Sequence, residues 1–297
     1  MNKKESASSN ISFISLMTAL NVIFVLISRF LPFSAFILMI ILPITTFLVT
    51  ILCQKKYILI YSFSCFILCL IASPADGLYY TLSTLLSGVV FGVCINRKLH
   101  YSFAILFGSL TATIINFITL PLIEWLFDIS VKQTFMLLLN IPTGYIDFIF
   151  PFFIAISSIL QCIFSFLITY NEVKKYNEQF NNQKEYRHIF SLISLICSLL
   201  AIGLSYVYMP LASICITFAF LTMILTLDIY FKKKIYWLFG LIIFIYLILF
   251  ASLYTLVKFP TNLNLLVLLP ILFAISTFTI IFIIRKKEKK TINNEND

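Results

Sequence analysis

Residues 101–127 read YSFAILFGSLTATIINFITLPLIEWLF, and this stretch contains one charged side chain, that of Glu124. A helix that crosses the hydrocarbon core of a bilayer needs about 20 consecutive, mostly apolar residues. This stretch is longer than that requirement, and its Phe, Ile and Leu residues fall on every face of a helix. Such a helix must be surrounded by protein or by lipid. The stretch therefore predicts a transmembrane helix.

The rest of the chain has the same character. Hydrophobic residues make up 61% of the sequence and charged residues 11%, and the mean hydropathy is +1.04. Soluble domains are closer to half apolar and a quarter charged. We predict an all-α, polytopic transmembrane helix bundle with ten spans, at residues 11–28, 31–53, 57–72, 78–95, 101–127, 145–170, 189–209, 211–231, 235–256 and 265–284. Residues 132–142 are too short to span, so they would lie in the membrane interface or extend the helix before them.

The basic residues give the orientation of these spans. With the N-terminus inside, all but three of the 21 lysine and arginine residues fall in loops or tails on the inner side, and the exceptions are Arg29, Lys132 and Lys258. Cytoplasmic loops carry such an excess of Lys and Arg. Both termini are thus predicted to be cytoplasmic in a multi-pass protein of a bacterial plasma membrane. The net charge of +9 is explained by these loops, and no nucleic-acid partner is expected.

The longest polar connection separates six predicted spans from four. We predict a six-span membrane domain at 1–170, a cytoplasmic linker at 171–188, a four-span extension at 189–284 and a basic tail at 285–297. The spans of the first domain carry side chains with amides, carboxylates and hydroxyls, and Gln161 is one of the residues with an amide. Those of the extension carry little besides Ser and Thr, whose hydroxyls can bond to their own helix.

Three charged residues at the predicted exterior ends of helices suggest a solute site. Glu124 lies about one turn before its helix leaves the membrane, and Pro121 loosens the helix one turn before it. An unpaired carboxylate in hydrocarbon is strongly unfavourable, so Glu124 must meet water, a cation or a ligand. We predict that it lines an outward-facing pocket with Arg29 and Asp147. The structural alternatives are a hydrated or ion-paired Glu124 and an Asp147 held by the dipole of its own helix.

Uncharged and small residues within the spans have two possible uses. Asn21 and Asn116 lie near the middle of their helices, where an amide bonds a neighbouring helix or contacts a solute. The pairs Ser15/Ala19 and Gly88/Gly92 each place two small residues four apart, which lets another helix approach closely. The sequence leaves open whether that helix belongs to the same chain.

Motifs for catalysis are absent from the sequence. It contains no GxxxxGK[ST] phosphate loop, no HExxH, no GxSxG and no CxxC. We therefore expect neither enzymatic activity nor a cofactor nor a metal site. Cys65 and Cys69 share a helix face, and small apolar packing residues are the expected role for both.

Three stretches carry a family resemblance, namely SLMTAL at 15–20, ILPIT at 41–45 and LSGVVFG at 86–92. Over about residues 11–170 the chain resembles the YybS-like bacterial membrane proteins, which look related to the S components of energy-coupling factor transporters. The resemblance implies binding or uptake of a small solute, whose identity it does not give. It also implies energy from separate ATPases through a transmembrane coupling subunit, which Ser15 and Ala19 would contact. The alternative is a membrane scaffold or assembly factor that transports nothing.

Overall fold

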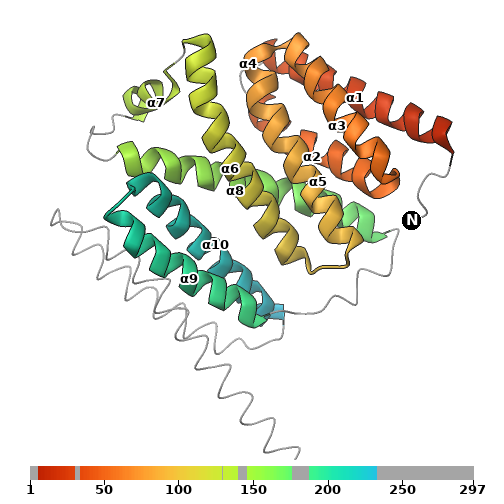
Figure 1. The fold of residues 1–297 in the computed structure, drawn as a ribbon. Helices are drawn as coiled ribbons and strands as arrows, with labels where there is room; N and C mark the ends of the chain where they lie inside the picture. The colour runs from red at the N-terminus through yellow and green to blue at the C-terminus, as the bar shows by residue number, and fades with distance from the viewer. Residues whose placement is uncertain (1–5, 31–33, 129, 140–145, 176–186, 233–297) are drawn as a thin grey trace, which may run out of the picture. The chain divides into compact units, whose positions relative to one another are not determined.

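The computed structural model of the chain describes residues 6–30, 34–128, 130–139, 146–175 and 187–232, and all regular structure in these ranges is helical (Figure 1). The elements are α1 (Ala7–Phe30), α2 (Ser34–Leu52), α3 (Lys55–Ala72), α4 (Pro74–Asp76), the π-helix η1 (Gly77–Thr81), α5 (Leu82–Asn96), α6 (Tyr101–Phe127), α7 (Val131–Leu139), α8 (Ile146–Lys175), α9 (Arg187–Ser205) and α10 (Met209–Lys232). The all-α prediction is confirmed for this part of the chain.

The first eight predicted spans each overlap a helix or a continuous helical run over most of their described residues. In the described residues, six helical segments are long and apolar enough to cross a membrane, and the apolar parts of α2 and α9 are shorter. The last two predicted spans, at 235–256 and 265–284, lie outside the described residues. The membrane-helix architecture is therefore confirmed, while the total of ten spans and the orientation remain predictions.

The segment after α6 forms a helix of its own. Asp128 has a φ of 53°, in the left-handed region, and this residue ends α6 before α7 begins at Val131. Asp is one of the few side chains that adopt this conformation with little strain. The alternative that residues 132–142 extend the preceding helix is wrong, and their placement in the membrane interface stays a prediction.

Two compact units divide the chain. One comprises residues 1–146 and 153–184, and the other comprises residues 147–152 and 185–297. Residues 147–152 of α8 thus belong to the second unit and the rest of α8 to the first. The predicted domain limits at 170, 188 and 284 stay predictions.

The Gly88/Gly92 pair of α5 makes a close helix contact in the first unit. A Cβ atom on Gly88 would lie 2.6 Å from the carbonyl oxygen of Pro43, and one on Gly92 would lie 2.4 Å from the Cβ of Thr50. Pro43 and Thr50 both belong to α2, so the partner of this GxxxG pair is a helix of the same chain. Close approach of backbones is the main use of such pairs in membrane helices, where apolar side chains gain little by leaving lipid.

Aromatic rings fill the space beside this contact. Phe47 of α2, Phe91 of α5 and Phe166 of α8 are buried and meet edge to face, with ring centroids 5.4–6.4 Å apart. The Phe91 ring also lies against Gly108 of α6, where a Cβ would be 2.1 Å from a ring carbon. This cluster joins α2, α5, α6 and α8 in one core.

A hydroxyl group lies beside the proline inside α2. Pro43 has no N–H to donate to the carbonyl of Met39. The hydroxyl of Ser165 in α8 lies 2.9 Å from the carbonyl of Ile40 and 3.5 Å from that of Met39, and it is 2.8 Å from the carbonyl of Gln161 in its own helix. In lipid, exposed carbonyls find no water, so a hydroxyl near this point of α2 is favourable.

In the second unit, α9 and α10 pack through small side chains. Ser194 of α9 donates to the carbonyl of Ala219 in α10 at 3.0 Å, and Ala201 is fully buried in the same contact. The other hydroxyls here mostly bond within their own helix, as Ser198 does to the carbonyl of Ser194 and Thr226 to that of Thr222. This pattern agrees with the structural role predicted for the hydroxyls of this region.

Candidate functional site

The first candidate, Asn21, is completely buried between α1, α2 and α3. Its amide nitrogen donates to the hydroxyl of Tyr61 at 2.8 Å and to the sulfur of Cys65 at 3.3 Å, and its carbonyl accepts from the hydroxyl of Thr45 at 2.8 Å. The hydroxyls of Thr45 and Tyr61 are themselves 3.2 Å apart. Both N–H bonds and the carbonyl of Asn21 are therefore in use, and of its two predicted roles the structure shows helix-to-helix bonding.

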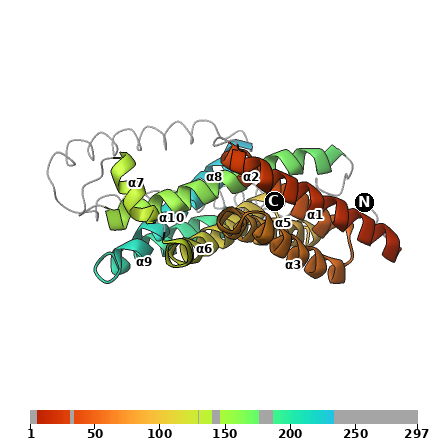
Figure 2. The same ribbon diagram turned by 90° about the horizontal axis from the view of Figure 1, so that it is seen from above.

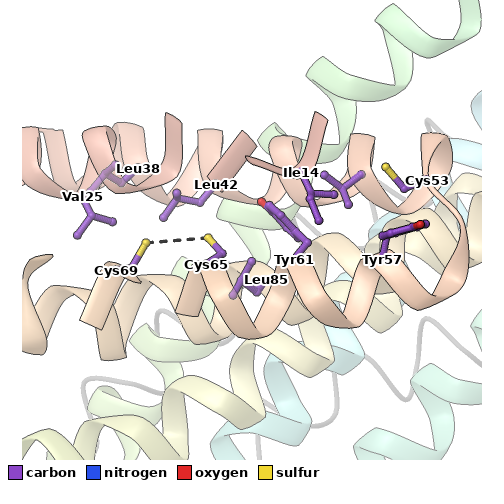
Figure 3. Packing of buried hydrophobic residues seen from close by; sticks show 11 residues of the cluster. Ile14, Val25, Leu38, Leu42, Cys53, Tyr57, Tyr61, Cys65, Cys69 and Leu85 are labelled. Atoms are coloured by element: carbon purple, nitrogen blue, oxygen red, sulfur yellow. Dashed lines mark hydrogen bonds between the residues drawn. The ribbon is translucent and has the colours of Figure 1, made fainter. Parts of the chain in front are cut away.

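α1 and α3 run side by side around this network (Figure 2). Asn10 accepts from the backbone N–H of Gln54 near the start of both helices, and Asn21 meets Tyr61 further along, so the two helices are parallel. Figure 3 shows Tyr61, Cys65 and Cys69 on the face of α3 that is turned toward α1 and α2. The network thus ties three consecutive helices together.

The second candidate, Asn116 of α6, is only half satisfied. Its amide nitrogen donates to the hydroxyl of Ser158 in α8 at 2.9 Å. Its carbonyl oxygen is buried and has no hydrogen-bond partner among the described residues. An unpaired buried polar atom costs about 1–3 kcal/mol, so this carbonyl is an exception that needs an explanation.

Gln161 of α8 is a stronger exception. Its side chain is 2% exposed, and neither its amide nitrogen nor its amide oxygen has a partner within the described part of the chain. Ser158 and Gln161 are three residues apart and therefore neighbours on one face of α8. Since Ser158 bonds Asn116 of α6, Gln161 lies about one helical turn along α8 from a residue that meets α6. From the sequence Gln161 is a polar residue within a predicted span, and it is not among the predicted site residues.

Glu124 has a structural partner. One of its carboxylate oxygens accepts from the backbone N–H of Lys132 at 2.9 Å. Lys132 is in the first turn of α7, where N–H groups lack helical partners and negative charge is favoured. Half-buried Glu124 thus fastens the turn between α6 and α7, while the neighbouring Trp125 is 79% exposed. A solute contact by Glu124 stays a prediction.

The predicted grouping of Glu124 with Arg29 and Asp147 is not tested by these contacts. The Arg29 side chain lies outside the described residues. Asp147 is exposed in the first turn of α8, as its helix-dipole alternative requires, and belongs to the second compact unit. The pocket formed by these three residues stays a prediction.

The two pairs of small residues have different surroundings. Gly88 and Gly92 are buried against α2, as described above. Ser15 and Ala19 are exposed on α1, and Ser8 and Ser12 continue the same stripe of small residues along this face. One pair is therefore used inside the chain, and the other is accessible to lipid or to another helix.

A cluster of three or more metal-ligating side chains is not present among the described residues. Among the described residues, no three His, Cys, Asp or Glu side chains are grouped closely enough to hold a metal ion. The expectation that the chain is not an enzyme remains an expectation.

Residues 19–141 match the model of a family described as predicted membrane proteins (DUF2232). The match runs from α1 to the end of the segment that contains α7, and it includes Asn21, Asn116 and Glu124 but not Gln161. Comparisons with curated proteins and with solved structures gave no match. The chain is thus similar to a family of membrane proteins, in agreement with its apolar helices, and its relation to YybS-like proteins or S components stays a prediction.

Proposed function

We propose that the first unit binds a small solute between α6 and α8, in the manner of an S component, and that separate ATPases energise its uptake. The observation that carries this proposal is the set of unpaired amide atoms on Asn116 and Gln161. They lie near the middle of two apolar helices, where water is scarce and unpaired polar atoms are expensive. A bound solute with hydrogen-bonding groups would satisfy them.

The chemistry of the two amides indicates the class of solute. Gln161 offers two N–H donors and one acceptor, and Asn116 offers one further acceptor. The buried side chains of the described residues include no Asp, Glu, Lys or Arg. The unpaired atoms comprise both donors and acceptors, which suit a neutral hydrogen-bonding group better than an ion of either sign, so the part of the solute that enters the site would be neutral. Amide-bearing molecules and nitrogen heterocycles, which present donors and acceptors on one edge, fit this requirement.

Coupling to a partner would use the open face of α1. Ser15 and Ala19 are exposed there, and small residues allow a helix of a coupling subunit to approach the α1 backbone. The same face would equally serve a membrane scaffold or assembly factor, which is the alternative function. The two functions can be distinguished by whether a solute is bound between α6 and α8, because a scaffold needs no solute.

The test is native mass spectrometry of the purified full chain, together with its resistance to thermal unfolding. The wild type should retain a co-purifying small molecule, and Gln161→Leu and Asn116→Leu should each reduce its occupancy at least tenfold. In solute-free protein Gln161→Leu should be neutral or stabilising, by up to about 1–3 kcal/mol, because it removes an unpaired buried amide. Gln133→Leu is the matched control, since Gln133 is exposed on α7.

Two results would contradict the proposal. One is a wild type that carries no solute while Gln161→Leu lowers stability, since the amide would then have a structural partner. The other is a solute whose occupancy is unchanged in both variants, since it would then bind elsewhere.

A further inference from the structure

A pair of thiols lies in the first unit, away from Asn116 and Gln161. Cys65 and Cys69 are one turn apart on α3, both are completely buried, and their sulfur atoms are 4.0 Å from each other. Figure 3 shows the two sulfurs turned toward each other in the space between α3 and the helices opposite. Neither is in a disulfide.

The surroundings of the pair are mainly apolar. Buried Val25, Leu38 and Leu42 belong to the same cluster as the thiols (Figure 3). The polar groups beside the pair are the amide of Asn21, whose nitrogen donates to the sulfur of Cys65 at 3.3 Å, and the hydroxyls of Tyr61 and Thr81, which lie beside Cys65 and Cys69. Such a donor stabilises negative charge on sulfur, and an apolar shell excludes water and additional ligands.

We infer that Cys65 and Cys69 form a two-coordinate site for a soft monovalent ion, namely Cu(I). Thiolates select soft metal ions, and Cu(I) is the first-row ion that needs no further ligand. Zinc sites take four ligands, or three and a water, and no third His, Cys, Asp or Glu joins the pair among the described residues. Twice a metal–thiolate bond of about 2.3 Å is about 4.6 Å, so the sulfurs need to separate only slightly from 4.0 Å to hold an ion between them.

Binding is an exchange of protons for copper. Each thiol releases its proton to solvent, and each sulfur donates an electron pair to the ion. Copper stays Cu(I) throughout, so the step needs neither an oxidant nor a reductant. The product carries one net negative charge, and the amide of Asn21 is the group placed to stabilise it. This site is independent of the proposed solute site, because it uses other residues on other helices.

The test is anaerobic titration of the full chain in detergent with Cu(I) supplied from a coloured chelator. We expect one equivalent to pass to the wild type. Cys65→Ser and Cys69→Ser should each weaken binding by more than the roughly 100-fold that loss of an outer-shell partner can cost. Cys94→Ser removes an equally buried but isolated thiol and should leave binding unchanged.

A second measurement does not depend on the variants folding. X-ray absorption of the wild type loaded with one Cu(I) should show two sulfur neighbours and no nitrogen or oxygen neighbour. A three-sulfur or mixed shell would overturn the inference. The inference would also be overturned if the wild type took no copper from the chelator. Copper binding by Cys65→Ser or Cys69→Ser as tight as that of the wild type would overturn it as well.

Discussion

Adding one methyl group to the α2–α5 contact tests the packing of the first unit. In Gly92→Ala the new Cβ would lie 2.4 Å from both the Cβ and the methyl carbon of Thr50. The Thr50 Cβ is bound to its backbone and cannot swing away, so the helices must separate or shift. Gly203 of α9 is the matched control, because a Cβ there would meet nothing within 4 Å.

The expected magnitude follows from two opposing effects. Alanine in place of glycine in a helix gains about 0.5–1 kcal/mol through backbone entropy. Forcing an extra carbon into a packed contact costs typically about 1–3 kcal/mol. Gly203→Ala should show only the gain, whereas Gly92→Ala should show both effects. The difference between the two variants then isolates the steric cost, about 1–3 kcal/mol in favour of Gly203→Ala.

The assay is unfolding of the purified protein by a denaturing detergent, followed by circular dichroism. Gly88→Ala should behave as Gly92→Ala does, since its Cβ would lie 2.6 Å from the carbonyl oxygen of Pro43, a backbone atom. If Gly88→Ala and Gly92→Ala are both as stable as Gly203→Ala, the α2–α5 contact described here is wrong.

Four further predictions concern other parts of the chain. Tyr61→Phe removes a hydroxyl that bonds Asn21 and should lower the free energy of unfolding by about 1–2 kcal/mol in the same titration. Ser165→Ala removes a hydroxyl that lies 2.9 Å from the Ile40 carbonyl of α2 and should cost about 0.6–1.7 kcal/mol if it bonds across the helices, and an unchanged stability would show that it bonds only within α8. Glu124→Gln keeps an acceptor for the α7 backbone and should melt within a few degrees of the wild type, whereas Glu124→Leu should lose about 1 kcal/mol. Reporter fusions after Asp76 and Arg187 should read exterior and cytoplasmic, and an exterior signal after Arg187 would refute the ten-span orientation.

The sequence predicted helix bounds best where a change from apolar to polar residues marks the end of a helix. The run 101–127 was predicted as one helix, and α6 occupies Tyr101–Phe127, because an apolar run bounded by polar residues marks both ends of a membrane helix. It was less informative at the end of α9, which was predicted to reach residue 209 but ends at Ser205. The break between the two spans was predicted, but the residues between α9 and α10 are nearly as apolar as the helices, so composition did not show that the turn begins after Ser205.

The sequence did not predict which residues on other helices bond or pack against a given side chain. Asn21 and Asn116 look alike in it, each a single amide near the middle of an apolar helix. In the structure Asn21 has all of its bonds to other helices, whereas Asn116 has one unpaired carbonyl. The difference comes from residues 24 to 44 positions away, and a single sequence does not contain that pairing. The same holds for Gly88 and Gly92, whose partner helix could be identified only from the fold.

The contrast between the two amide sites also bears on function. A bundle that needs only stability can bond its amides as Asn21 is bonded, or replace them with apolar side chains of similar size. Leucine at position 161 would fill nearly the same space without leaving polar atoms unpaired, so glutamine there is unfavourable for the isolated chain. That free energy would be recovered if a molecule from outside the chain supplied the missing hydrogen bonds. For this reason we propose the solute site at Asn116 and Gln161, and a structural role for the fully bonded network around Asn21.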